Sequence, residues 1–301
     1  MGPRILVTGA FGQIGTELVE ALEERHGQGN VIATDVREGG GCRILDVMDA
    51  EGILSLVSNE GITEIYHLAA LLSATGERNP ELCWKINVGG LENVILAAKA
   101  NGCRVFAPSS IAVFGPDCPS IAPQITPLNP TTVYGKTKVV SEQMAMTAGV
   151  DMRGLRYPGL ISYKAPAGGG TTDYAVEIFH AALAEGHYTC FVREDTRLPM
   201  MYMDDAIRAT LELMGASAER LGGARGGYNI TGCSFTVGEL VQSIQRHLPD
   251  FTCAYEPDVR QNYADSWPKD IDDEVARSEW GWTPQFDLDG MVDAMFAGLQ
   301  A

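Results

Sequence analysis

Short apolar runs alternate with amphipathic stretches along the first half of the chain. RILVT, VIATD and EIYHLAA are rich in β-branched and other apolar residues, and they are short enough to be buried strands. Helical spacing of apolar positions follows each of them, and two further strands, RVFAPSS and DMRGLR, complete the pattern. The predicted helices cover 13–26, 52–59, 81–100 and 132–147. This alternation predicts a doubly wound α/β fold, in which helices cover both faces of a parallel sheet.

The regularity loosens after Arg156. The stretch YPGLISYKAPAGGG, residues 157–170, holds two prolines and four glycines and is predicted to be a loop. Shorter elements follow, with helices over 204–214, 237–247 and 288–299 and a strand at GYNI. We therefore predict a Rossmann domain over residues 1–157, completed by segments near 200–230, and a smaller carboxyl-terminal substrate-binding lobe over 158–199 and 231–301.

A glycine-rich turn, GAFGQIG, joins the first strand to the first helix. Gly9, Gly12 and Gly15 suit a tight bend, a backbone that approaches a pyrophosphate, and close packing of helix on strand. The helix amino terminus then faces the phosphates, with Gln13 and Ile14 beside them. The spacing G-x-x-G-x-x-G is a weak signal alone, but its place between strand and helix predicts a dinucleotide site.

Acidic residues at the ends of the next apolar runs indicate which dinucleotide binds. Asp35 ends the second strand, where a carboxylate accepts hydrogen bonds from ribose hydroxyls and repels a 2′-phosphate, so the prediction is NAD. Arg37 is the one residue nearby that could accommodate such a phosphate. Asp46 suits a contact with the adenine amino group, and Val47 would pack beside it.

The sequence YGKTK places Tyr134 and Lys138 four residues apart on one face of a predicted helix. Upstream, the strand RVFAP ends in Ser109 and Ser110, which would emerge at the carboxyl edge of the sheet, where such folds bind ligands. A Tyr/Lys pair at this spacing is also common on solvated helix faces. Its position after a serine-bearing strand end favours a catalytic role.

Together these motifs resemble the extended branch of the short-chain dehydrogenase/reductase superfamily, which includes the UDP-galactose epimerases. The resemblance assigns the serine, tyrosine and lysine roles to Ser110, Tyr134 and Lys138. It implies that Tyr134 removes a hydroxyl proton while hydride passes to the nicotinamide, that Ser110 holds the substrate oxygen, and that Lys138 also binds the nicotinamide ribose. It further implies cofactor contacts from Leu68, Ala69, Ala70, Asn87 and Tyr157.

A tyrosine that acts as a base near neutral pH needs a pKa about three units below the ordinary value of about 10. We expect the Lys138 ammonium and the positive nicotinamide ring to supply that shift by stabilising the phenolate.

Longer segments narrow the resemblance to the short-chain-type L-threonine 3-dehydrogenases. These segments are LLSATGE, RYPGLIS, GGGTTDYAVEIFH, DTRLPMMYMDDAIRAT, YNITGCSFT and ADSWPKDIDD. The resemblance implies NAD-dependent oxidation of L-threonine at C3 to 2-amino-3-oxobutanoate, and a homodimer formed through the helices over 81–100 and 132–147. No spacing of metal ligands is present, so we expect no metal.

A site for threonine must hold an ammonium, a carboxylate and a methyl group. Ser73 and Thr75 can offer hydroxyls from a loop after the fourth strand, although turn formation would also explain them. Thr171, Thr172 and Asp173 can offer hydroxyls, amides and a carboxylate, and they also suit the cap of the helix that follows. Gly168 to Gly170 would let this loop move over the pocket.

Other polar residues stay open or are expected to be structural. Arg197 could bind a carboxylate or pair with an acidic neighbour such as Asp195. His67 and His180 lie in apolar patterns, so structural roles are expected for them.

Composition excludes several classes of function. The chain has 301 residues and a net charge of −17, which opposes binding of nucleic acid or an anionic membrane surface. No basic leader or long apolar run is present, and the seven scattered cysteines include no C-x-x-C pair, so we expect a cytoplasmic protein with reduced thiols. Two alternatives remain on the same fold: a nucleotide-sugar epimerase or dehydratase, and a non-catalytic dinucleotide-sensing protein.

Overall fold

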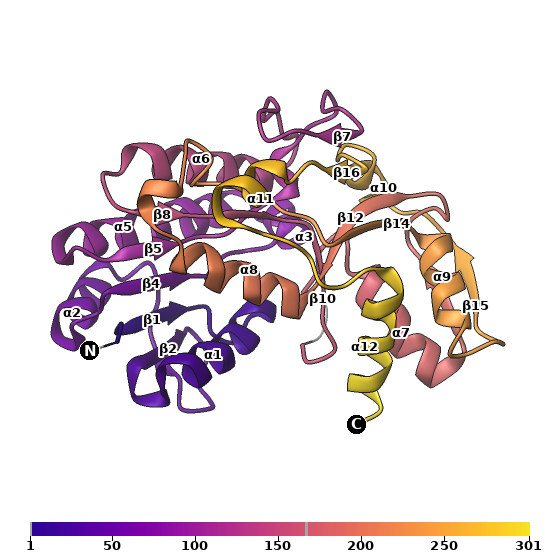
Figure 1. The fold of residues 1–301 in the computed structure, drawn as a ribbon, viewed down its shortest axis with the longest axis horizontal. Coiled ribbons are helices and arrows are strands. Elements are labelled where there is room, and N and C mark those ends of the chain that lie inside the picture. Colours follow the sequence, from indigo (N-terminus) through magenta and orange to yellow (C-terminus); the bar gives the residue numbers. More distant parts are fainter. Residues whose placement is uncertain (1, 166–167) are drawn as a thin grey trace.

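A six-stranded parallel sheet organises the first half of the chain (Figure 1). The computed structural model describes residues 2–165 and 168–301, so residues 166–167 of the predicted loop and Met1 lie outside the described residues. The strand order is β3-β2-β1-β4-β5-β8, and every neighbouring pair is parallel. This is the Rossmann order, so the predicted fold class is confirmed. The strands are β1 Ile5–Thr8, β2 Val31–Asp35, β3 Arg43–Ile44, β4 Glu64–His67, β5 Arg104–Phe106 and β8 Met152–Arg153.

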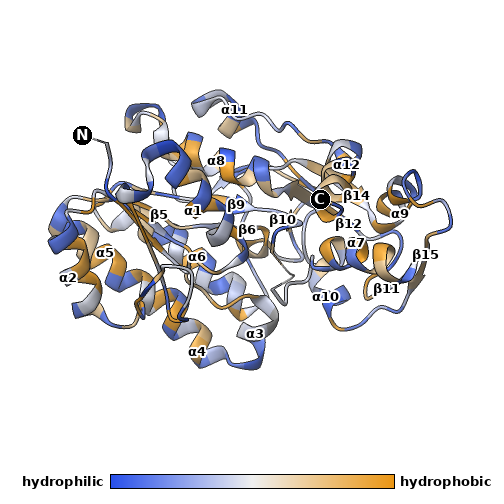
Figure 2. Cartoon of the chain, turned by 90° about the horizontal axis from the view of Figure 1, so that it is seen from below, coloured by the Kyte–Doolittle hydropathy of each residue, from blue (hydrophilic) through white to orange (hydrophobic). Residues whose placement is uncertain are grey.

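Helices cover both faces of this sheet (Figures 1 and 2). On one face, Ile5 and Val7 of β1 pack with helices α1 Gln13–His26, α8 Met203–Gly215 and α11 Glu274–Trp280. On the other face, Leu6 packs with α2 Ala50–Glu60, α5 Gly90–Asn101 and α6 Val133–Thr147. Successive residues of a strand point to opposite faces, so a strand buried on both sides appears in the sequence as the continuous apolar run ILV.

Most predicted helices agree with the observed ones within a few residues, including α1, α2, α6, α8, α9 Val237–Gln245 and α12 Leu288–Leu299. The helix predicted over 81–100 is helical throughout but has three parts: α4 Pro80–Trp84, a π-helical turn η2 Lys85–Gly89, and α5. A π turn inserts into a helix without ending its apolar periodicity, which is why the sequence pattern does not reveal it.

The prediction of a loop over 157–170 is wrong in part, because β10 Gly159–Ile161 is a strand. It pairs in parallel with β12 Arg197–Tyr202, which pairs antiparallel with β14 Cys233–Thr236. Gly159 is needed for packing rather than for a turn, since a Cβ there would lie 2.2 Å from the Met200 sulfur. Glycine content alone therefore gave the wrong assignment.

A second apolar core lies in the carboxyl-terminal part of the chain. It gathers α7 Tyr174–Glu185, β11 His187–Cys190, α9 and α12, and β11 pairs in parallel with β15 Thr252–Tyr255. Trp280 and Trp282 instead pack in the core of the large sheet. The predicted division into two lobes remains a proposal. The remaining elements are α3 Ser73–Arg78, α10 Arg260–Ala264, β6 Ser109–Ser110, β7 Ile121–Ala122, β9 Leu155–Tyr157, β13 Tyr228–Asn229, β16 Asp270–Ile271, and the short helices η1 Gln28–Asn30, η3 Ile111–Val113 and η4 Ala218–Arg220.

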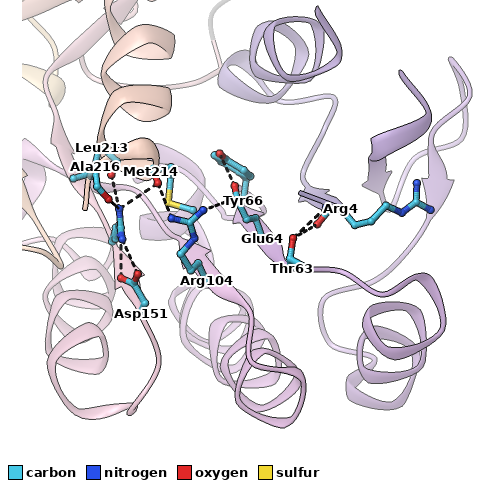
Figure 3. A network of polar contacts seen from close by, with 10 residues as sticks. Arg4, Thr63, Glu64, Tyr66, Arg104, Asp151, Leu213, Met214 and Ala216 are labelled. Atoms are coloured by element: carbon cyan, nitrogen blue, oxygen red, sulfur yellow. Dashed lines mark hydrogen bonds and ion pairs between the residues drawn. The ribbon is translucent and has the colours of Figure 1, made fainter. Parts of the chain in front are cut away.

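Two arginines fix α8 to the sheet edge (Figure 3). The buried Arg153 donates through Nη1 to the carbonyls of Leu213, Met214 and Ala216 at 2.7, 3.2 and 2.8 Å. Arg104 donates to the Met214 carbonyl at 3.0 Å. These carbonyls lie at the carboxyl-terminal end of α8, where the Leu213 carbonyl also accepts the Ala216 amide at 3.2 Å. Carbonyls at a helix end need partners from outside the helix, and a positive charge there interacts favourably with the negative end of the helix dipole.

Among the described residues, no helix combines the length and the apolar character needed to cross a bilayer.

Candidate active site

The glycine turn between β1 and α1 leaves no room for side chains. Gly9 has a φ of +73°, and a Cβ there would lie 2.7 Å from the Ala69 nitrogen. A Cβ on Gly15 would lie 2.3 Å from the Gly9 carbonyl oxygen, and one on Gly12 would lie 3.2 Å from it. The turn thus brings bare backbone to the start of α1, a helix end where anions bind readily. Of the three glycines, Gly15 serves helix packing rather than the cavity.

A cavity of about 330 Å³ opens beside this turn. Eight of the residues predicted to bind the cofactor line it: Gly9, Gly12, Asp35, Asp46, Val47, Leu68, Ala69 and Ala70. It also includes Arg37, Val36, Leu45, Leu71 and Ile86. The Asp46 carboxylate accepts the Met48 amide at 2.9 Å, which orients its loop. The residues present fit a dinucleotide.

Asp35 and Arg37 form a fork at one end of this cavity. Arg37 donates through Nε to Oδ1 of Asp35 at 3.0 Å and through Nη2 to Oδ2 at 3.3 Å. The Phe11 amide also donates to the carboxylate, at 3.1 Å, so Asp35 anchors the glycine turn. Burial raises the pKa of this carboxyl, but the hydrogen bonds from Arg37 and Phe11 more than compensate and hold it below its usual value. Asp35 is therefore a carboxylate at neutral pH.

Asn87, which was predicted to contact the cofactor, does not line the cavity beside the glycine turn. It lies in the π turn η2, accepts the Leu71 amide at 2.8 Å and donates to the Leu71 carbonyl at 3.0 Å. It also donates to Thr137 of α6 at 3.2 Å. Asn87 thus holds the segment after β4 in place, and any effect on the cofactor passes through Leu71.

A second cavity, of about 150 Å³, brings together the predicted catalytic residues. Tyr134 and Lys138 of α6 and Ser110 of β6 line it, and Lys138 donates to the Pro108 carbonyl at 2.8 Å. Tyr157 forms another part of the wall, and its hydroxyl hydrogen-bonds Thr210 of α8. The remaining predicted residues in this wall are Gln13, Ile14, Leu68, Ala70, Ser73, Thr171, Thr172 and Asp173.

The net effect of the protein's own groups is to raise the pKa of the Tyr134 phenol. Burial is the main reason why this pKa is raised to about 12. The Ser110 hydroxyl acts in the opposite direction and lowers the pKa, whereas the nearby Cys83 thiol raises it slightly further. The Lys138 ammonium lies 5.6 Å from the centre of the tyrosine ring. Burial lowers the pKa of Lys138 itself to about 8. Burial is the largest influence on this phenol, and the expected stabilisation of the phenolate by Lys138 and the nicotinamide ring together stays a prediction.

The start of α6 is held from two sides. Thr132 accepts the Gly135 amide at 3.1 Å as a side-chain cap. Glu77 of α3 accepts the Val133 amide at 2.6 Å and the Tyr134 amide at 3.3 Å. A carboxylate at a helix amino terminus stabilises both the free N–H groups and the helix dipole. The backbone that carries Tyr134 is thereby fixed.

Ser73 and Thr75 were expected in a loop, and the structure places them in helix α3. Ser73 begins this helix, is buried and lines the small cavity, whereas Thr75 is exposed and does not line it. One helical position separates side chains by about 100°, so residues two apart cannot both face the pocket. The structure therefore brings Ser73 to the cavity but leaves Thr75 out.

Asp173 does not cap helix α7 with its side chain as expected. Its Oδ2 instead accepts the amides of Gly169 and Gly170 at 2.6 and 2.7 Å, which folds the glycine loop back onto it. Burial raises the pKa of this carboxyl, and the two amides oppose that shift. The backbone carbonyls of Thr172 and Asp173 accept the first amides of α7.

Several cavity residues were missed in the sequence. The list includes Leu72, Pro108, Ile111, Ala112, Pro158, Gly159, Leu160 and Trp267, whereas Ser109 and Gly170 also line the cavity and had been expected near it. Most are neighbours of assigned residues, and the strand-end rule could have found them. Trp267 comes from the distant segment ADSWPKDIDD, and no local pattern in the sequence indicates that it reaches the site.

Arg197, which the sequence left open, pairs with Glu239 at 2.6 Å and donates to the Ser234 carbonyl at 2.6 Å. His67 is buried and hydrogen-bonds Thr8 at 2.9 Å, which agrees with a structural role. Burial lowers its pKa to about 3, so it is neutral. Within residues 2–165 and 168–301, no group of three or more His, Cys, Asp or Glu side chains could hold a metal ion.

Comparisons with known proteins place this chain among enzymes that share the fold. A model of the NAD dependent epimerase/dehydratase family matches residues 5–230. An uncharacterized epimerase/dehydratase of Staphylococcus haemolyticus is 45% identical over 311 residues, covering 99% of this chain and 98% of that relative.

Two solved structures are similar along nearly the whole chain. A monomeric L-threonine 3-dehydrogenase from a metagenome, in its apo form, has a TM-score of 0.95 and 51% identity, covering 98% of each chain. The holo form of a GalE-like L-threonine dehydrogenase from Cupriavidus necator also has a TM-score of 0.95 and 51% identity, covering 99% of this chain and 100% of that one.

Proposed function

The chain belongs to the NAD-dependent epimerase/dehydratase family, and from that premise we propose that it is an L-threonine 3-dehydrogenase. NAD is its cofactor, and its solved structural neighbours are L-threonine dehydrogenases of the extended short-chain type. The proposed reaction oxidises L-threonine at C3 to 2-amino-3-oxobutanoate. The observation that carries the proposal is the 150 Å³ cavity, whose wall contains both the Tyr134/Lys138 pair and Thr171, Thr172 and Asp173.

The size of this cavity favours a small substrate. Threonine needs one alcohol near a base, acceptors for its ammonium and donors for its carboxylate. A nucleotide sugar would need a far larger pocket, since ligand sites for drug-sized molecules occupy about 300–1,000 Å³. Arg197, at the position where epimerase relatives hold a nucleotide phosphate, is already paired with Glu239. Both observations favour threonine over a nucleotide sugar.

In the proposed reaction Tyr134 accepts the proton of the C3 hydroxyl while the C3 hydrogen leaves as hydride. Bound NAD supplies the hydride acceptor and a positive ring beside the phenol. Ser110 holds the substrate oxygen, and its hydrogen bond favours the phenolate form of Tyr134. Lys138 would hold the nicotinamide ribose.

We assign protein groups to the ammonium, the carboxylate and the methyl group of threonine by their charge and polarity. The Asp173 carboxylate is the acceptor for the ammonium, and the hydroxyls of Ser73 and Thr172 are donors for the carboxylate. The apolar side chains of Leu72, Ala112 and Trp267 can contact the methyl group. Thr75, which faces away, is no longer included.

The purified protein with NAD⁺ and L-threonine provides the test. We expect NADH absorbance to rise, and Tyr134→Phe to lower turnover by orders of magnitude with NAD binding nearly unchanged. No NADH together with conversion of a UDP-sugar would replace the proposal with the epimerase alternative. NAD binding without turnover of either would favour the dinucleotide-sensing alternative.

We also propose that two copies associate through α4, α5 and α6. Large apolar side chains on these helices are exposed, including Leu82, Trp84, Leu96 and Met146. Exposed apolar side chains gathered on neighbouring helices are typical of association surfaces. Sedimentation at equilibrium tests this, and a single-chain mass across micromolar concentrations would overturn it.

A further inference from the structure

Three consecutive residues at the end of the strand segment 108–110 are each bound by helix α6. Ser110 lines the small cavity together with Tyr134 and lowers the pKa of its phenol, and the Pro108 carbonyl accepts from Lys138 at 2.8 Å. Ser109, between them, donates to Oε1 of Glu142 at 2.6 Å. The three partners on α6 are four residues apart, so they lie along one face of the helix.

Glu142 is held in turn by Arg156 of β9. The guanidinium donates through Nε to Oε1 at 2.9 Å and through Nη2 to Oε2 at 2.8 Å. Both side chains are about nine-tenths buried, with exposed fractions of 7% for Arg156 and 11% for Glu142. The remaining Arg156 nitrogen donates to the Gln124 carbonyl and to Asn229 at 3.1 Å each. A fork of this kind, buried and fully hydrogen-bonded, fixes its partner in one geometry.

The pairing of strands β6 and β9 also holds Ser109 and Arg156 next to each other. In the parallel pair β6–β9, Ser109 lies opposite Arg156 and Ser110 lies opposite Tyr157. Gly227 makes room for the ion pair, since a Cβ there would lie 2.4 Å from the Glu142 carboxyl carbon. Ser109 is therefore held from the helix through Glu142 and from the neighbouring strand through the backbone.

We propose that Ser109 and Glu142 are positioning residues for the oxidation, extending the Tyr134/Lys138 pair by one helical turn. Their hydrogen bond keeps residues 108–110 at the distance from α6 that lets Ser110 meet Tyr134 and lets Pro108 hold Lys138. Arg156 keeps Glu142 in the geometry that this bond requires. Neither Ser109 nor Glu142 takes part in proton or hydride transfer. The proposal rests on the proposed function, since it concerns the same reaction.

Ser109→Ala removes this hydrogen bond and leaves the Glu142–Arg156 ion pair intact. We expect kcat to fall about tenfold, since displacement of reacting groups by a fraction of an ångström has effects of this size. KM for L-threonine and NAD⁺ should stay within about twofold. Ser243→Ala is the matched control, because Ser243 is also buried and donates to a carboxylate at 2.7 Å, that of Asp289, between helices α9 and α12. The two variants should have similar unfolding midpoints, and only Ser109→Ala should lose turnover.

Glu142→Asp withdraws the carboxylate from Ser109 while keeping its charge. If both residues act through one bond, the double variant with Ser109→Ala should be no slower than the slower single variant. A kcat for Ser109→Ala within about twofold of the parent would overturn the proposal. It would also be overturned by a raised KM with unchanged kcat, which would make Ser109 a substrate contact, or by an equal loss of turnover in Ser243→Ala.

A second measurement does not depend on threonine turnover. The Nζ resonance of Lys138, followed by NMR in ¹⁵N-lysine-labelled protein, should titrate near a pKa of about 8. In Ser109→Ala the Pro108 carbonyl should shift away from the Lys138 ammonium, which weakens a hydrogen bond to the charged form, so this pKa should fall further. An unchanged titration in Ser109→Ala would overturn the positioning role. Absence of NADH formation in the parent protein would overturn only the proposed substrate.

Discussion

Replacing Asp35 by alanine should weaken the protein's preference for NAD⁺ over NADP⁺, because we propose that this one carboxylate performs two tasks in the cofactor cavity. Asp35 is positioned to accept hydrogen bonds from the ribose hydroxyls. It also holds the Arg37 guanidinium through contacts of 3.0 and 3.3 Å. Asp35→Ala removes the acceptor for NAD, removes the negative charge that repels a 2′-phosphate, and releases Arg37 to bind that phosphate.

The two effects differ in size because the two side chains differ in exposure. Asp35 is 6% exposed, so losing its hydrogen bonds to the ribose should cost about 2–3 kcal/mol, or about 30- to 150-fold in kcat/KM for NAD⁺. The Arg37 side chain is 61% exposed, so pairing with a 2′-phosphate should contribute only about 1 kcal/mol. The preference for NAD⁺ over NADP⁺ should therefore fall about 10²- to 10³-fold, mainly through the loss for NAD⁺.

The assay is kcat/KM for NAD⁺ and NADP⁺ at saturating L-threonine, with Asp35→Ala compared to Asp35→Ala/Arg37→Ala. The double variant should lose the gain with NADP⁺ while keeping the loss with NAD⁺. Asp35 also accepts the Phe11 amide, so its loss can disorder the glycine turn. That disorder would lower kcat/KM for NAD⁺ and for NADP⁺ to the same extent and would leave their ratio unchanged. An unchanged ratio of the two efficiencies would refute the assignment of Asp35 to the ribose.

Three further predictions concern buried groups. Arg153→Met should lower the free energy of unfolding in urea by about 3–5 kcal/mol, because it leaves the Asp151 carboxylate and the Ala216 carbonyl without the donor that Arg153 supplies, although Arg104 still donates to the Met214 carbonyl; a loss below about 1 kcal/mol would show that water replaces the guanidinium. Gly15→Ala should abolish NAD binding measured by calorimetry, since its Cβ would lie 2.3 Å from the Gly9 carbonyl oxygen, and retained affinity would mean that the turn relaxes. For Lys138→Met, the pH dependence of stability follows from the folded-state pKa of Lys138 of about 8, which lies below its pKa in the unfolded chain. Between these two pKa values the unfolded chain binds more protons than the folded protein. The free-energy cost of burying the ammonium in the parent protein is therefore present below pH 8 and is relieved as the pH rises. The variant should thus be more stable than its parent by a margin about 2 kcal/mol larger at pH 7 than at pH 10, and a margin independent of pH would contradict the shift.

The sequence predicted the first half of the fold because the determining interactions there are local. The apolar run ILV predicts a strand that is buried on both faces, and the glycine turn and helix α1 follow it within a few residues. The same locality brought Tyr134 and Lys138 to one helix face. The relative position of these two side chains depends only on their separation of four residues along the helix, which can be read from the sequence.

Prediction failed where tertiary contacts override local preference. Gly159 suggested a loop, but it is a strand residue whose missing side chain admits Met200, more than forty residues away. Asp173 has the residue type of a helix cap, yet it binds the glycine amides that precede it. Trp267 reaches the cavity from another part of the chain. None of these outcomes has a signal within a few residues of the position concerned.

The distance between the catalytic groups and the proposed substrate groups is set by strand register rather than by free contact between two lobes. Ser110 lies opposite Tyr157 in the β6–β9 pair, and the chain continues from Tyr157 through Pro158 into β10. At Gly159 the absent side chain lets Thr172 approach, since a Cβ there would lie 2.8 Å from its methyl carbon. A continuous backbone path with one close contact therefore links the serine that meets Tyr134 to the threonine proposed to hold the substrate. Because hydride transfer requires the reacting atoms within a few tenths of an ångström, rigid strands are better suited to fix this distance than a mobile loop.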